Sequence, residues 1–162
     1  MPEICFSAAR RHFILCSGIV GLAALASCRS VLPTVAGAGA SAAAASYLDS
    51  FRRDAGLAPL APHARLERAA IRQAGYMAVS GRMEHTAMRG RDFVSRMREA
   101  GIEPPAAENL AWGRMDLDRL FATWMNSPPH RKNMLDPRFT RFGLAYASDG
   151  NGARYWSLNL AG

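Results

Sequence analysis

Two short runs near the end of the sequence alternate apolar and other side chains, and they constrain the fold more than any other feature. The first covers residues 139–147 and the second covers residues 153–160. The apolar positions that set the alternation are Phe142, Leu144, Tyr146, Tyr155, Trp156 and Leu158. Asp149-Gly150-Asn151-Gly152 lies between the runs and is typical of a tight turn, so the pair predicts an antiparallel β-hairpin. Such a hairpin is stable only when other elements cover its apolar face.

Apolar residues at helical spacing precede this hairpin. They predict helices at about residues 46–55, 63–80 and 91–100. A fourth helix begins after Asp116 and Asp118, which are short acidic side chains of the kind that cap free backbone amides. Helices that flank a small antiparallel sheet define an α+β fold.

The stretch Ala106–Leu135 carries side chains suited to chemistry. Glu108 lies in a loosely alternating run that predicts a short strand ending at a glycine. His130 follows two consecutive prolines, which fix the backbone of this junction, so we expect its imidazole to be held at a defined place. His85 lies upstream, in a predicted loop after the second helix, and loops on a rigid scaffold often carry sites.

Three segments carry a family resemblance: Glu84-His85-Thr86, Glu108 to Gly113, and Trp124 to Leu135. They resemble the CAP superfamily of secreted cysteine-rich, antigen 5 and pathogenesis-related proteins, most closely its short bacterial members. The resemblance runs from about residue 46 to the end of the chain. It implies a three-layer α-β-α sandwich with a small antiparallel sheet, and a central cleft where two histidines meet acidic residues. Asn109 and Trp112 are expected at this cleft, unless they only pack or satisfy backbone groups.

Two histidines and a carboxylate are suitable ligands for Zn²⁺, although a lone loop histidine is more often structural. The resemblance implies a divalent metal in this cleft in some family members. We therefore expect His85 and His130 to bind Zn²⁺ or another divalent cation, with Glu108 as a third ligand or as the group that positions a bound water. The segment after Trp124 lacks the second glutamate of the animal-type cleft. Glu84 either replaces that glutamate or is a solvent-facing neighbour of His85.

The first 28 residues are predicted to be an export signal. Two arginines precede a short apolar run at residues 13–25. This run is shorter than a typical membrane-spanning helix, so an export signal is the preferred interpretation. Leu25-Ala26-Ser27-Cys28 resembles a bacterial lipobox, in which Cys28 would be acylated. The alternative is ordinary cleavage near residues 35–38. Residues 29–45 are rich in Ala, Gly and Ser and are predicted to be a tether, and residues 46–162 to be the single CAP domain.

Cysteine positions and charge limit the function further. All three cysteines lie in the leader, so the folded part is expected to depend on its core alone. The formal net charge is +7, and the basic residues are spread along the chain without a clustered run. This distribution argues against a nucleic-acid groove and fits solubility or weak attraction to acidic envelope polymers. We expect a monomer.

Three functions remain as hypotheses, and enzymatic activity is the less favoured class. The first is a lipid-anchored protein of the periplasm or cell surface, or a secreted one, that binds an unidentified small molecule, lipid or polymer of the envelope in the cleft. The second is a zinc-assisted hydrolase of peptide or envelope polymer with Glu108 as general base. The third is a lipid- or sterol-binding module. The sequence has no phosphate-binding glycine loop and no Gly-x-Ser-x-Gly elbow.

Overall fold

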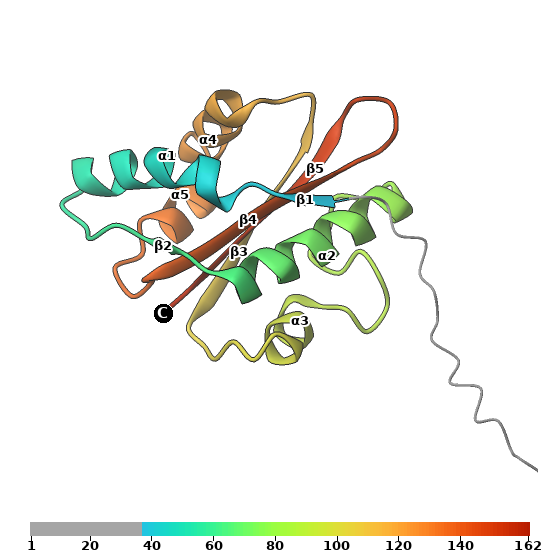
Figure 1. Cartoon of the computed structure of the whole chain (residues 1–162), viewed down its shortest axis with the longest axis horizontal. Coiled ribbons are helices and arrows are strands. Elements are labelled where there is room, and N and C mark those ends of the chain that lie inside the picture. Colours follow the sequence, from blue (N-terminus) through green and yellow to red (C-terminus); the bar gives the residue numbers. More distant parts are fainter. Residues whose placement is uncertain (1–36) are drawn as a thin grey trace, which may run out of the picture. The chain divides into compact units, whose positions relative to one another are not determined.

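The computed structural model describes residues 37–162, so the predicted export signal and Cys28 lie outside the described residues. The elements are β1 (Gly37–Gly39), α1 (Ser41–Asp54), β2 (Ala61–Pro62), α2 (Ala64–Ser80), α3 (Phe93–Glu99), β3 (Ala106–Gly113), α4 (Leu117–Met125), α5 (Pro128–Met134), β4 (Arg141–Ser148) and β5 (Arg154–Ala161) (Figure 1). All of them belong to one compact unit, Val31–Gly162. Among the described residues, no helix is both long and apolar enough to cross a membrane.

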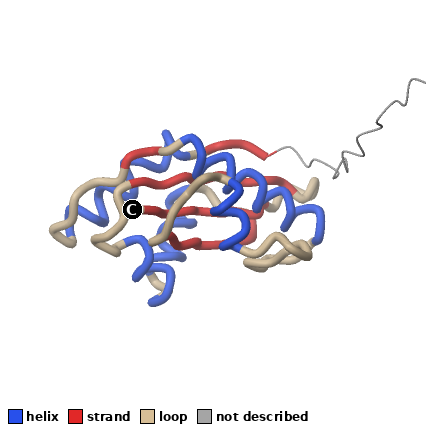
Figure 2. The backbone as a smooth tube through the Cα atoms, turned by 90° about the horizontal axis from the view of Figure 1, so that it is seen from below, coloured by secondary structure: helices blue, strands red, loops and turns tan. Residues whose placement is uncertain are grey.

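The strands form one small sheet in the order β1-β4-β5-β3. Neighbours in this order are antiparallel, and the two-residue β2 pairs in parallel with the start of β4. Figure 1 views the sheet nearly edge-on, with α1, α4 and α5 on one side and α2 and α3 on the other, and Figure 2 shows the strands side by side. The predicted α+β fold with three α-β-α layers is confirmed, and so is the terminal hairpin of β4 and β5.

Each face of the sheet has its own core. The larger core lies against α1, α4 and α5, and it includes Leu48, Phe121, Trp124, Phe142 and Trp156. Side chains on the opposite face pack against α2 and α3 in two smaller clusters. Gly143 of β4 lies directly beneath α2, because a Cβ atom at this position would be 2.1 Å from the backbone nitrogen of Glu67. Both cores are made from the described residues, so this unit contains what it needs to fold on its own.

The predicted tether is wrong for residues 37–45, which belong to the fold. Ser41 donates its backbone N–H to the Glu67 carboxylate at 3.0 Å, and its hydroxyl accepts from the Leu144 N–H at 3.0 Å. A Cβ atom on Gly39 would lie 2.4 Å from the same Glu67 carboxylate. The small side chains resembled a flexible linker, but here they allow β1 and the start of α1 to pack closely against α2 and β4.

The prediction for the proline pair also needs correction. Pro128 and Pro129 occupy the first positions of α5, and His130 follows them within that helix. Proline is favoured at the first helical position because its missing N–H has no intrahelical acceptor there and its φ angle suits the helix. His130 is therefore fixed by a short helix rather than by a rigid junction. The cap at α4 is as expected, since the Asp116 side chain accepts from the Arg119 N–H at 2.9 Å.

Candidate functional site

Glu108 lies on β3, an edge strand of the sheet, and its carboxylate is buried under α3. Arg96 of α3 donates to both carboxylate oxygens, at 2.6 Å and 2.9 Å. Both side chains are only 1% exposed. The two-point contact of a planar guanidinium with a carboxylate fixes both groups and cancels their charges where water is excluded. This buried ion pair is the anchor of the candidate site.

His85 connects this buried pair to the surface. Its Nδ1 lies 2.8 Å from Oε2 of Glu108, while its side chain is 61% exposed. A carboxylate accepts hydrogen bonds, so Nδ1 carries the proton and Nε2 is the nitrogen left for an external partner. The hydrogen bond with Glu108 raises the pKa of His85 above its ordinary value, against the opposing effects of partial burial and of the Arg96 charge. The imidazole therefore stays protonated to a higher pH than an unperturbed histidine does.

Buried polar groups hold the backbone that carries His85. Arg96 donates from Nη2 to the His85 carbonyl at 3.0 Å, and Gln73 of α2 donates to the Glu84 carbonyl at 2.6 Å. Ser157 of β5 donates to the Glu108 carboxylate at 3.4 Å. Gln73 and Ser157 are fully buried. These contacts restrict the orientation of the histidine, as a binding or catalytic group requires.

Sequence reasoning missed Arg96, Gln73 and Ser157, the residues that support this site. Each looked like an ordinary helix or strand residue. One signal was present for Arg96: it lies one turn after Phe93 and beside Met97, on the helix face predicted to be buried. A long charged side chain on a buried face needs a buried partner, and Glu108 was the acid already singled out.

His130 lies on the other side of β3. The side chains of Asn109 and Glu108 point to opposite faces because they are neighbours in a strand. Asn109 donates to the His130 carbonyl at 3.0 Å, and Asn133 donates to Asn109 Oδ1 at 2.9 Å. Asn109 has no exposed surface. It is therefore a link between β3 and α5 rather than the wall of an open cleft.

The His130 ring is half-buried next to Trp124, with 6.4 Å between the ring centroids. Its Nδ1 is buried without a hydrogen-bond partner in the described part of the chain. Burial lowers the pKa of His130, and the positive charge of His85 lowers it further. The environments of the two imidazoles therefore shift their pKa values in opposite directions.

These contacts do not fit the metal site predicted from the sequence. Residues 37–162 contain no group of three or more His, Cys, Asp or Glu side chains arranged to hold a metal ion. Both oxygens of Glu108 are already bound by Arg96, and a cation beside this guanidinium would be repelled. Glu84 does not replace the missing acid, because it pairs with Arg82 at 2.8 Å on the surface, as its solvent-facing interpretation predicted.

Trp112 is the predicted cleft residue that stays accessible. Trp112 is four residues after Glu108 in β3, so their side chains lie on the same face of the strand. Trp112 is 54% exposed. Its ring lies 6.2 Å from that of the buried Tyr155. The other two tryptophans, Trp124 and Trp156, are core residues with almost no exposed surface.

Comparison with known proteins agrees with the fold. The pattern of CAP, the cysteine-rich secretory protein family, matches residues 45–160. The chain is 32% identical over 112 residues to the uncharacterized protein YkwD of Bacillus subtilis (strain 168). That alignment covers 68% of this chain and 42% of YkwD, so the chain spans less than half the length of this relative.

Solved structures share the fold at lower identity. An outer surface protein of Borrelia burgdorferi has a TM-score of 0.67 at 19% identity, covering 77% of this chain and 97% of that one. An extracellular protein of Bacillus anthracis that contains an SCP domain has a TM-score of 0.66 at 22% identity, covering 74% of this chain and 39% of that one. A cysteine-rich secretory protein of Staphylococcus aureus has a TM-score of 0.59 at 22% identity, covering 74% of this chain and 36% of that one.

Proposed function

The chain belongs to the CAP family of cysteine-rich secretory proteins, and on this premise we propose that it is an exported protein that binds an anionic group of an envelope component through His85. Export is supported by the predicted signal in residues 1–28 and by two structural relatives, which are described as an outer surface protein and as an extracellular protein. We also propose that Cys28 carries a lipid anchor.

The observation behind the binding proposal is the exposed His85 held by the buried pair of Glu108 and Arg96. The charges of the pair cancel, so protonation of His85 adds one positive charge at the surface of the site. Its Nε2–H then points away from Glu108 and can donate a charge-assisted hydrogen bond to a carboxylate or phosphate. A preoriented donor loses less side-chain entropy on binding than a mobile one. An anionic ligand is therefore the class that this geometry favours.

Sedimentation with purified peptidoglycan sacculi, whose peptides carry carboxylates, tests this proposal. The unit Val31–Gly162 should sediment more strongly at about pH 5.5 than at about pH 8.5, because the imidazole loses its charge across this range. His85→Gln should weaken binding at the lower pH by about tenfold, the effect of one hydrogen bond to a charged group.

His63→Gln is the matched control, because it removes a histidine at the start of α2 without touching the site. It should bind as the parent does. Equal binding by the parent and His85→Gln at both pH values would remove the proposal.

The hydrogen bond between His85 and Glu108 also favours a second function, general-base catalysis in a hydrolase. In neutral His85 the Nδ1 proton is held by Glu108, so the Nε2 lone pair faces outward and can accept a proton. Activity would then rise with pH through the pKa of His85, whereas anion binding falls. The zinc-assisted form gains no support, because it needs Glu108 as a free base. Hydrolysis of sacculi that increases with pH and is lost in His85→Gln would favour catalysis.

The lipid anchor has a separate test. Cells that express the full chain should incorporate labelled palmitate into it, and Cys28→Ser should abolish the label and release the protein from the membrane fraction. Loss of the label without release would mean that another part of the protein holds it at the membrane. Equal labelling of parent and variant would contradict the anchor.

A further inference from the structure

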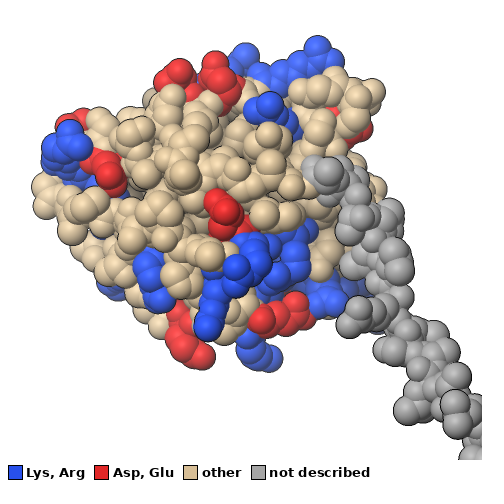
Figure 3. All heavy atoms as spheres, in the orientation of Figure 1, with Lys and Arg blue, Asp and Glu red and all other residues tan. Residues whose placement is uncertain are grey.

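The outward face of α2 carries a stripe of three arginines. Arg65, Arg68 and Arg72 are spaced by three and four residues, so they share one side of the helix. Arg65 and Arg68 are exposed, whereas Arg72 is half-buried and its Nε is covered by the protein. Over seven residues this stripe is about 10 Å long. None of the three takes part in an ion pair within the described part of the chain, and Glu67, between them in sequence, turns instead to the Ser41 amide. Figure 3 shows basic side chains gathered over this region.

The positive charge of this stripe affects a nearby histidine. His63, at the start of α2, has a lowered pKa, first because of burial and then because of the charges of Arg141, Arg65 and Arg68. Like charges on one helix face destabilise a helix only slightly, so α2 can keep these three arginines without acidic partners. An unneutralised stripe of this kind attracts polyanions.

Helix α3 extends the same surface and adds apolar groups to it. Met97 of α3 and Ile102, which follows the helix, pack against Leu66 of α2. Arg65 of α2 lies near Gly101, just after the end of α3. Arg98 is exposed on α3, and Val94 is 62% exposed.

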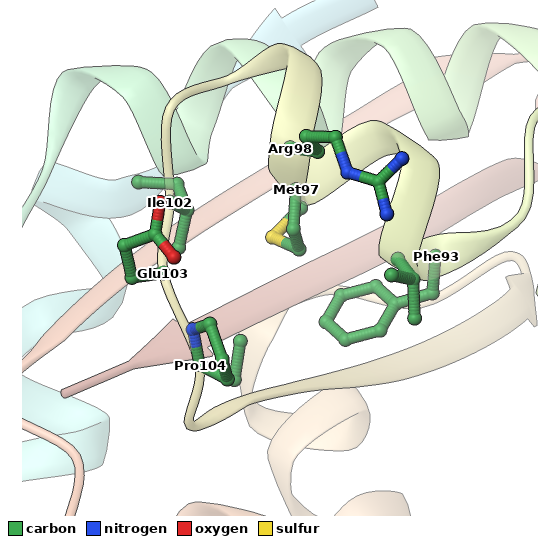
Figure 4. A pocket seen from close by; sticks show the side chains of 8 residues that line it. Phe93, Met97, Arg98, Ile102, Glu103 and Pro104 are labelled. Carbon is green, nitrogen blue, oxygen red and sulfur yellow. The ribbon is translucent and has the colours of Figure 1, made fainter.

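Beside these residues is a pocket of about 530 Å³. Figure 4 shows the side chains of Phe93, Met97, Arg98, Ile102, Glu103 and Pro104 around it. The lining is mostly apolar, with one basic and one acidic group. Glu99, the acid of α3, pairs with Arg91, so the combined α2–α3 face keeps a net positive charge.

The N-terminal end of the described chain lies against α2. A Cβ atom on Gly37 would be 3.1 Å from Ile71, the neighbour of Arg72. Only eight residues separate Gly37 from Cys28. Even a fully extended chain of that length reaches only about 30 Å. A membrane to which Cys28 is attached would therefore be within reach of the α2–α3 face.

We propose that the α2–α3 face docks on an anionic lipid bilayer, with Arg65, Arg68, Arg72 and Arg98 at the headgroups and Val94 at the apolar boundary. Basic residues near exposed apolar groups are the usual composition of a peripheral membrane surface. A soluble polyanion would use the arginines alone and would leave Val94 and the apolar pocket without a role. The surface is separate from His85, so it and the binding proposal can fail independently; only the nearness of the membrane rests on the proposed anchor at Cys28.

Vesicle sedimentation of the unlipidated unit Val31–Gly162 tests this surface. It should bind vesicles of phosphatidylcholine with about 30% phosphatidylglycerol, bind pure phosphatidylcholine poorly, and be released by about 1 M salt. The triple variant Arg65→Gln, Arg68→Gln, Arg72→Gln should bind anionic vesicles on the order of 100-fold more weakly, which is about fivefold for each arginine.

A second triple variant controls for net charge. Arg53→Gln, Arg119→Gln and Lys132→Gln remove three exposed positive charges from the other helical layer, on α1, α4 and α5. It should retain most of the vesicle binding. Equal loss in both triple variants would overturn the proposal, because the attraction would then depend on total charge alone.

A third comparison separates lipid from soluble polyanion. Val94→Ser should weaken binding to anionic vesicles and leave binding to polyphosphate unchanged. If Val94→Ser has no effect on vesicles and polyphosphate binds as tightly as they do, the face recognises a soluble polyanion and the membrane proposal is wrong. Circular dichroism of each variant confirms that all are folded before binding is compared.

Discussion

Replacing Arg96 by methionine should be far more damaging than replacing both Arg96 and Glu108. Both side chains are 1% exposed, and Arg96 donates to both oxygens of Glu108. Removal of the guanidinium alone leaves a buried carboxylate whose remaining donors are His85 and Ser157. Losing one partner of a buried ion pair costs about 3–5 kcal/mol, a large part of the ~5–15 kcal/mol by which domains of this kind are stable.

The double variant Arg96→Met, Glu108→Met removes the whole pair. Buried ion pairs replaced by apolar residues of similar volume are often as stable as the parent. Here the backbone carbonyls of His85 and Arg91 also lose their Arg96 donors, at about 1 kcal/mol each. We therefore expect the double variant to lie within about 2 kcal/mol of the parent.

Urea unfolding followed by tryptophan fluorescence measures both variants, because Trp124 and Trp156 are buried in the core and report its exposure. With a slope of about 2 kcal/mol per molar urea, the single variant should unfold at a urea concentration lower by roughly 2 M and the double variant by roughly 1 M or less. Two results would refute this reasoning: a loss of less than about 1 kcal/mol in the free energy of unfolding of the single variant, or a double variant no more stable than the single. Either would mean that Arg96 and Glu108 do not form a coupled ion pair from which water is excluded.

Three further outcomes are expected. Gly143→Ala should destabilise the unit by about 3 kcal/mol or prevent folding, as judged by circular dichroism, because α2 leaves no room for the added methyl group. A chain that begins at Ser46 should unfold at lower urea than one that begins at Val31, because it lacks β1 and the start of α1. In NMR titrations the pKa of His85 should lie above its ordinary value and fall in Glu108→Gln. The His85 contact should add stability that is full below about pH 6.5 and is lost as the pH rises through the folded-state pKa.

Much of the fold was predictable because its signals are local. The alternation in residues 139–160 predicted β4 and β5, and the acidic cap before α4 predicted where that helix begins. The family motifs predicted the three layers. The strand alternation and the helix cap depend on neighbours along the chain, so they need no knowledge of which elements pack together. The layers followed from the family resemblance alone.

The domain boundary was not predictable in the same way. A run of Ala, Gly and Ser has the same composition in a flexible linker as in a strand that must pass close to a helix. Only the position of Glu67, whose carboxylate takes the space beside Gly39, distinguishes the two. The proline pair before His130 was similarly ambiguous, since proline both ends one helix and begins the next.

The sequence by itself determined the class of fold and most of its longer elements, and the family motifs singled out His85 and Glu108, which lie together at 2.8 Å. Only the tertiary structure decided what these residues can do. Arg96 reaches Glu108 from another element, and its charge turns a suspected metal ligand into the fixed support of an exposed histidine. The sequence gives the chemistry of each side chain. Which charged or polar group lies next to that side chain depends on packing between segments that are distant along the chain.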